Sequence, residues 1–216
     1  CKTHNAALLY LALYSDSKYV KCKAQSMCKS MTEVLANDYV NFAITAANRH
    51  MIGYTENTTV LVIPRTFECE GVLYKVTRID NSAFFNCDKL ISVTIPDSVT
   101  FIDYNAFTGC KRLSEISIPN SIRDICSATF KNCTSLSEIT IPESVVNIWS
   151  GAFSGCSNLR KINIPSTILK IDNGAFQDCI KLKTLYYKGS MDQWKNIDIG
   201  PHNLSLKNAV KIFNKT

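Results

Sequence analysis

A fixed spacing of 23 residues constrains the fold of this chain more than any other feature of its sequence. Three residue types recur at this spacing: Phe84, Phe107, Phe130, Phe153 and Phe176; Cys87, Cys110, Cys133, Cys156 and Cys179; Leu90, Leu113, Leu136, Leu159 and Leu182. A period of about 20 to 29 residues with leucine-type residues at fixed places is the signature of a stacked solenoid. The sequence therefore predicts an array of five regular repeats.

Three of the repeats contain the pattern Leu-x-x-Ile-x-Ile, the first has Val93 at the first isoleucine position, and the last has Leu185 and Tyr187 at the two positions. In the first four repeats a proline follows. The alternation predicts a short strand, and proline ends it because proline has no amide hydrogen for the sheet. In the second repeat Leu113, Ile116 and Ile118 are expected to face inward, and the apolar residues Ile122 and Ile125 follow. Equivalent strands of successive repeats are expected to stack in parallel, about 4.8 Å apart.

The outward positions of these strands are the candidate ligand-binding residues. They form two predicted columns: Ser92, Glu115, Glu138, Lys161 and Thr184 in one, and Thr94, Ser117, Thr140, Asn163 and Tyr186 in the other. Glu115 and Glu138 become like-charged neighbours about 5 Å apart, which is normally unfavourable, and Lys161 relieves part of the repulsion. Tyr186 is the best candidate for an anchor, since tyrosine often carries binding energy at interfaces.

Half of the ten cysteines occupy one place in the repeat. Stacked identical side chains point the same way, so we expect a column of buried thiols that act as small hydrophobic groups. The remaining cysteines lie outside this column and are freer to form disulfides or to stay reduced: Cys1, Cys22, Cys28, Cys69 and Cys126.

The segments around the array are irregular. Residues 1–38 form an N-terminal extension, in which the apolar spacing predicts a helix over 23–37. Residues 39–78 form a β cap, in which alternation predicts a hairpin with a first strand from Tyr39 and a return strand over 51–54. Further strands are expected over 59–64 and 72–76.

The array itself covers residues 79–188, and residues 189–216 form a mixed C-terminal cap. Such caps are expected because the last repeat of a solenoid otherwise leaves an apolar face open to water. Trp194, Ile197 and Leu204 are among the apolar side chains expected to close this end.

The sequence does not favour catalysis, a metal site or a cofactor. The repeat cysteines have no histidine within their repeats to act as a base, and no Cys-x-x-Cys, His-x-x-x-His or glycine-rich phosphate loop occurs. The net charge of +6 is spread without a block of basic residues, so nucleic acid is not expected as a partner. No apolar run is long enough to span a membrane.

The unit Ala-Phe-x-x-Cys-x-x-Leu, followed by Ile-x-Ile-Pro-x-Ser-Val and an isoleucine, resembles the BspA-type leucine-rich repeat. Residues 52–64 and 186–194 also look like the usual flanks of such arrays. The resemblance implies a right-handed leucine-rich-repeat solenoid, mostly β with short turns, between a β-hairpin N-cap and a mixed C-cap. It further implies an extracellular or cell-surface protein with a role in adhesion to host or matrix components.

Our leading hypothesis is a non-enzymatic protein-interaction or adhesion module that binds a protein ligand through the concave face of the array. A glycan is the alternative ligand. The alternative functions are a structural scaffold or spacer that presents residues 1–38, and an enzyme that uses one of the cysteines outside the column.

Overall fold

The computed structural model describes residues 40–45, 47–69 and 72–213. Contacts divide the chain into two compact units: of the described residues, 40–42 and 66–75 belong to the first, and 43–65 and 76–213 to the second. The helix predicted over 23–37 lies outside the described residues, as do Cys1, Cys22 and Cys28.

The first unit contains an antiparallel strand pair. Strand β3 (Thr66–Cys69) runs opposite the first half of β4 (Val72–Ile79), so that the strand predicted over 72–76 is confirmed. Phe67 and Tyr74 stack with ring centroids 5.2 Å apart, and Phe42 meets Phe67 edge-on at 4.8 Å. These rings supply apolar contacts among the described residues of this unit.

Strand β1 (Val40–Ile44) forms where alternation predicted it, but the return strand predicted over 51–54 is wrong. Residues Arg49–Ile52 form the 3-10 helix η1 instead. The Asn48 side chain accepts a hydrogen bond from the Thr45 amide at 2.7 Å, and the Arg49 amide donates to the Thr45 carbonyl at 3.1 Å. Asparagine side chains favour such local turns, so the chain curls before a second strand can form.

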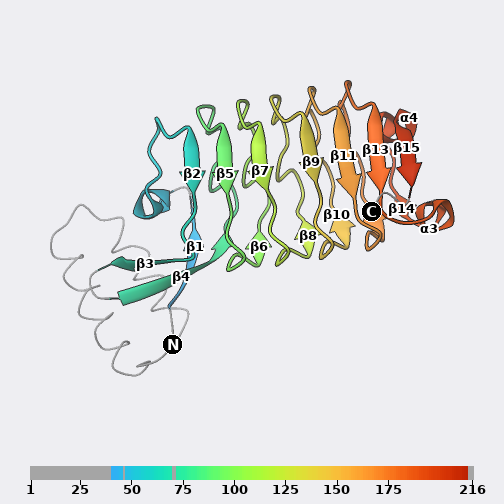
Figure 1. Ribbon diagram of the computed structural model, residues 1–216. Coiled ribbons are helices and arrows are strands. Elements are labelled where there is room, and N and C mark those ends of the chain that lie inside the picture. Colours follow the sequence, from blue (N-terminus) through green and yellow to red (C-terminus); the bar gives the residue numbers. More distant parts are fainter. Residues whose placement is uncertain (1–39, 46, 70–71, 214–216) are drawn as a thin grey trace. The chain divides into compact units, whose positions relative to one another are not determined.

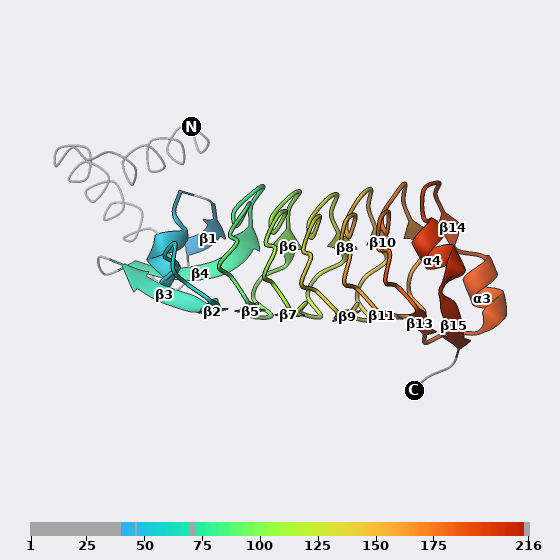
Figure 2. The same ribbon diagram turned by 90° about the horizontal axis from the view of Figure 1, so that it is seen from above.

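The second unit is a stack of turns that follow one another along the array (Figures 1 and 2). Each turn contributes one strand to each of two parallel ladders. The first ladder contains β2 (Val60–Val62), β5 (Ser92–Thr94), β7 (Glu115–Ser117), β9 (Glu138–Thr140), β11 (Lys161–Ile164), β13 (Thr184–Tyr187) and β15 (Val210–Phe213). The second contains β4, β6 (Phe101–Ile102), β8 (Asp124–Ile125), β10 (Asn147–Ile148), β12 (Lys170–Ile171) and β14 (Asp198–Ile199).

A column of phenylalanine rings runs through the core. The five repeat phenylalanines are 0% exposed, and successive rings are nearly parallel with centroids 5.2 to 5.6 Å apart. The five repeat cysteines are also buried, so the predicted thiol column is confirmed. The strand residues that face inward, such as Ile139 and Ile162, fill the remaining interior.

The turn that carries Phe and Cys needs a left-handed backbone at two places in every repeat. One place immediately precedes the cysteine and is taken by Asn86, Gly109, Asn132, Gly155 and Asp178; the other is taken by Ser82, Asn105, Ala128, Gly151 and Gly174. Glycine, asparagine and aspartate tolerate this conformation better than other residues, which explains most of these choices.

In the C-terminal cap a side chain supplies a hydrogen-bond acceptor that the next repeat supplies elsewhere in the array. In the regular turns the amide of the repeat phenylalanine donates to a carbonyl of the next turn, as Phe153 does to Ala175 at 2.8 Å. The Phe176 amide donates instead to Oδ1 of Asn203, which is 1% exposed, at 2.9 Å. The buried asparagine therefore takes the place of the next main chain.

Two short helices, α3 (Met191–Lys195) and α4 (Leu204–Asn208), complete this cap. Trp194 packs edge-on against Tyr187 with ring centroids 5.1 Å apart. The prediction that Trp194 and Ile197 are buried is confirmed, whereas Leu204 is 68% exposed and Leu206 is buried in its place.

Candidate functional site

The two predicted columns of outward side chains lie along the first ladder. Ser92 pairs with Glu115 and Thr94 with Ser117 in one stretch of the ladder. In the other stretch Lys161 lies between Glu138 and Thr184, and Asn163 lies between Thr140 and Tyr186. The fixed 23-residue spacing places each residue beside its equivalent, because parallel strands pair in register here.

Polar contacts run along the columns in the second stretch. The Lys161 ammonium lies 3.7 Å from a carboxylate oxygen of Glu138, as the sequence predicted. The Asn163 amide donates to Oγ1 of Thr140 at 2.9 Å. Both partners of the ion pair are about half exposed, so the pair contributes less than about 1 kcal/mol to stability. These side chains remain accessible to a ligand.

The ladder is interrupted between β7 and β9, where the sequence placed two adjacent glutamates. Figure 1 shows these strands farther apart than their neighbours in the ladder. Ile116 on β7 is partly exposed, whereas its equivalents Ile139 and Ile162 are buried. The expected in-register pairing of Glu115 with Glu138 is therefore not formed, since the two strands share no ladder hydrogen bonds in the described structure.

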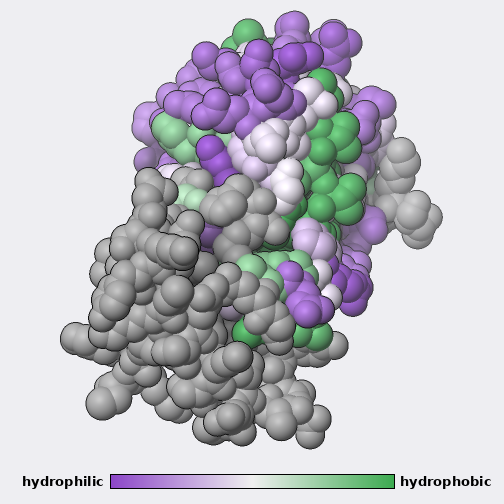
Figure 3. Space-filling model, turned by 90° about the vertical axis from the view of Figure 1, so that its left-hand side faces the viewer, coloured by the Kyte–Doolittle hydropathy of each residue, from purple (hydrophilic) through white to green (hydrophobic). Residues whose placement is uncertain are grey.

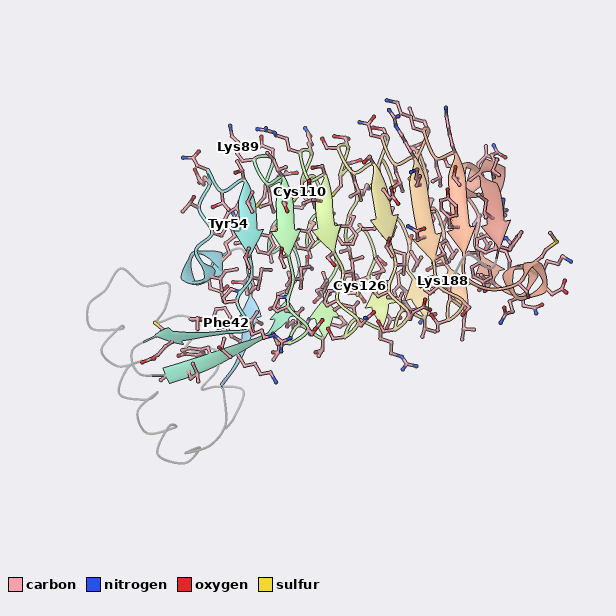
Figure 4. All side chains as sticks on the ribbon, viewed as in Figure 1. Phe42, Tyr54, Lys89, Cys110, Cys126 and Lys188 are labelled. Atoms are coloured by element: carbon pink, nitrogen blue, oxygen red, sulfur yellow. The ribbon has the colours of Figure 1, made fainter. Side chains whose placement is uncertain are left out.

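A groove of about 510 Å³ occupies this interruption. Ser117, Glu138 and Thr140, which the sequence predicted as site residues, line it together with Glu143 and Lys188. The Lys188 ammonium and a carboxylate oxygen of Glu143 form an ion pair of 2.6 Å at the groove, and Figure 4 labels Lys188. No sequence pattern pointed to Glu143 and Lys188, because both follow the strands whose outward positions defined the columns.

The outward face of the ladder is polar in the middle and apolar at its ends. Val60 and Val62 on β2 are 62% and 65% exposed, and Val210 and Ile212 on β15 are 65% and 39% exposed. Figure 3, which views the molecule from the side nearer β2, shows hydrophobic surface beside hydrophilic surface. The sequence columns missed these residues because both strands lie outside the five regular repeats.

Four of the five repeat thiols form the same hydrogen bond to a phenylalanine carbonyl of the preceding repeat, and Cys87 of the first repeat is the exception. The Sγ of Cys110 donates to the carbonyl of Phe84 at 3.0 Å, and Cys156 donates to Phe130 in the same way at 3.1 Å. Burial raises the pKa of Cys110 and of Cys179 from 9.0 to about 12. The thiolate is the reactive form of cysteine, so these side chains are structural groups at neutral pH.

Cys126 lies outside the column but is also buried, at 4% exposure. Its pKa rises from 9.0 to about 11, because of burial first and then the nearby carboxylates of Asp103 and Asp124. Of the two states expected for Cys126, a disulfide or a reduced thiol, the structure has the free thiol, and its burial disfavours the reactive thiolate at neutral pH. Cys69 is partly exposed.

Residues 73–197 match the BspA type leucine rich repeat region in six copies. The chain belongs to this family.

Solved structures support the same fold for this BspA-type chain. A leucine rich cell surface protein from Faecalibacterium prausnitzii is 36% identical with a TM-score of 0.61, and the match covers 67% of this chain and 36% of that protein. A leucine rich repeat protein from T. pallidum is 27% identical with a TM-score of 0.60, over 74% of this chain and 71% of that protein. The chain thus spans about a third of the first relative's length and most of the second's.

The pneumococcal vaccine antigen PcpA shares the fold, with 18% identity and a TM-score of 0.55 over 74% of this chain and 42% of that protein. A comparison with curated proteins found none that matches this chain.

The described residues contain no group of three or more His, Cys, Asp or Glu side chains placed to hold a metal ion. Within the same residues, no helix has the length and apolar character needed to cross a membrane.

Proposed function

We propose that this chain is a non-enzymatic interaction module that binds a protein ligand through the outward face of its first ladder, at the cell surface or outside the cell. The groove between β7 and β9 carries the proposal, because predicted site residues from two turns line one concavity there. Concave sites with a few placed polar groups are where proteins bind ligands.

The composition of the face supports a protein as the ligand. Exposed Val60 and Val62 at one end, and Val210 and Ile212 at the other, flank the polar centre. An extended face of this kind can bury apolar surface at its ends and form polar contacts in its middle. The cell-surface relative from F. prausnitzii supports the proposed location.

Binding to purified extracellular-matrix proteins and to a glycan array, measured by surface plasmon resonance, tests the proposal. The decisive variant replaces Glu115, Glu138 and Lys161 with alanine, and its circular dichroism spectrum must match that of the parent. A matched control replaces two exposed acids and one exposed base away from the strands, Glu56, Asp88 and Lys89. Figure 4 shows Lys89 at the edge of the array.

We expect a protein ligand whose affinity falls at least about tenfold in the face variant and stays unchanged in the control, since hot-spot side chains dominate interface energies. Equal affinity for both variants would exclude the face. Binding confined to glycans would replace the protein ligand with the alternative.

A further inference from the structure

Both strand ladders of the array are interrupted, and the interruptions follow one another along the chain. On one face the ladder runs from β2 through β5 to β7 and resumes at β9. On the other face it runs from β4 to β6 and resumes at β8. The array therefore contains two continuous blocks: the first ends with β6 and β7, and the second begins with β8 and β9.

Residues 118–123 connect the blocks, since they join the end of β7 to the start of β8. This connecting segment is tied to both blocks by serine hydroxyl groups. The Ser121 hydroxyl donates to the Val99 carbonyl of the first block, and Ser144 of the second block donates to the Ile122 carbonyl at 2.6 Å. The segment thus touches both blocks without joining their ladders.

Main-chain amides at the two interruptions lack the partners that their equivalents have. In the second block the Trp149 amide donates to the Ile125 carbonyl at 2.9 Å, and the Arg160 amide donates to the Ser137 carbonyl at 2.8 Å. The equivalent amides one repeat earlier, those of Cys126 and Ser137, have no acceptor among the described residues. The blocks are therefore not joined by ladder hydrogen bonds on either face.

The Phe–Cys turn joins the blocks directly. The Phe107 amide donates to the Thr129 carbonyl at 2.9 Å, and the Gly109 amide donates to the Lys131 carbonyl at 2.8 Å. The rings of Phe107 and Phe130 stack with centroids 5.6 Å apart, the widest of the four spacings in the column. The column is therefore continuous across the boundary between the blocks.

The strands on the two sides of the first interruption each carry an exposed glutamate. Glu115 ends the first block on this face, and Glu138 begins the second. Glu138 pairs with Lys161, which belongs to its own block, and no ion pair joins Glu115 to any described residue. Like charges on neighbouring strands repel, so the pair favours separation of the blocks.

The second interruption has the same arrangement. Asp103 forms an ion pair with Arg78 in the first block, and Asp124 accepts a hydrogen bond from Asn147 in the second at 2.7 Å. Both carboxylates act on the Cys126 thiol, which lies near them at the interruption. The polar partner of each carboxylate thus lies in that carboxylate's own block, and neither partner bridges the blocks.

We propose that the array is hinged at residues 118–123, with the Phe–Cys turn as the axis, so that rotation of one block against the other widens or narrows the groove between β7 and β9. Rotation about this turn changes both interruptions together. The proposal of a hinge depends only on the fold. Its effect on ligand binding rests on the proposed function, since the groove lies on the face that is proposed to bind the ligand.

Residue-resolved hydrogen exchange of the ligand-free chain by NMR tests the hinge. We expect the Ser137 and Cys126 amides to exchange at least about 100-fold faster than those of Arg160 and Trp149, because ladder hydrogen bonds protect only the second pair. The variant Glu115→Lys places opposite charges across the first interruption. The control Ser92→Lys introduces the same side chain at the equivalent position of an intact ladder.

In Glu115→Lys, a hinge closes both interruptions, so the amides of Ser137 and Cys126 gain protection together, whereas Ser92→Lys leaves both unchanged. Equal exchange at the four amides of the parent chain would overturn the hinge. The hinge would also be overturned if Glu115→Lys increased the protection of the Ser137 amide but not of the Cys126 amide, because the two interruptions would then be independent. An unchanged protection of both amides in Glu115→Lys would overturn it as well. Because no ligand is present, none of these results depends on whether the face binds a protein.

Discussion

The phenylalanine column makes a quantitative prediction about which part of the array contributes most to stability. Phe153 stacks on Phe130 at 5.3 Å and on Phe176 at 5.2 Å, so it has a ring on each side. Phe176 stacks on Phe153 and has no second ring partner among the described residues. Both side chains are 0% exposed and occupy the same place in the repeat.

Replacing each phenylalanine with leucine keeps an apolar side chain and removes the ring contacts. A stacked aromatic pair contributes about 0.5–1.5 kcal/mol beyond its buried area, so Phe153→Leu forfeits about 1–3 kcal/mol from two pairs. The void left by the smaller side chain adds about 1 kcal/mol. We therefore expect a loss of about 2–4 kcal/mol for Phe153→Leu and about 1.5–2.5 kcal/mol for Phe176→Leu.

Urea unfolding followed by far-ultraviolet circular dichroism measures both losses, and an unchanged slope with denaturant shows that the comparison is valid. The two variants serve as controls for each other, since the substitution and the burial are the same. Equal losses, or a larger loss for Phe176→Leu, would refute the argument that ring stacking adds to the burial of each ring.

Three further changes test the cap, the turns and the buried thiols. Asn203→Ala leaves the buried Phe176 amide without its acceptor, and the free energy of unfolding should fall by about 1–3 kcal/mol in urea; no loss would contradict the capping role. Ala128→Gly should stabilise the protein by up to about 1 kcal/mol, and Gly151→Ala at the equivalent place should destabilise it by as much, because both sites have a left-handed backbone; changes of the same sign would contradict this. Because folding raises the pKa of Cys110 from 9.0 to about 12, its stabilising contribution is complete below about pH 9 and falls by about 1.4 kcal/mol per pH unit above it; a constant urea midpoint from about pH 8 to pH 10 under reducing conditions would contradict this.

Much of the fold could be predicted because each residue pattern occurs five times, so that every inference rests on five independent positions. One phenylalanine says little about its surroundings, but five at a constant spacing must stack if their turns stack. The same reasoning placed the cysteines inside and Lys161 beside Glu138. The prediction of a return strand over 51–54 was wrong because this segment lies outside the repeats and rested on a single alternating pattern. A local hydrogen bond between the Thr45 amide and the Asn48 side chain favours a turn there instead.

The sequence predicted the two columns of outward side chains but not the interruption between β7 and β9 or the groove that occupies it. Period alone implies that every turn stacks equally on the next, so it predicted Glu115 in contact with Glu138. Side-chain repulsion of a few tenths to about 1 kcal/mol is smaller than the hydrogen bonds of a ladder. The interruption therefore requires more than these two residues, and Asp103 and Asp124 at the other face supply a second source of repulsion.

The positions that break the pattern therefore carry more functional information than those that keep it. In the turn that follows β8, Cys126 stands where Asp103 and Asp172 stand in other repeats. Each of those aspartates accepts a hydrogen bond from the next main-chain amide, at 2.7 Å for Asp103 and 2.8 Å for Asp172, and so fixes its turn. A thiol is a much weaker acceptor, so the turn at Cys126 lacks this support. Trp149 stands at the same place and lacks the carboxylate as well, but its amide donates to the Ile125 carbonyl at 2.9 Å, whereas the Cys126 amide has no acceptor among the described residues. The turn at the boundary between the two blocks is therefore the less constrained of the two, as a hinged array requires.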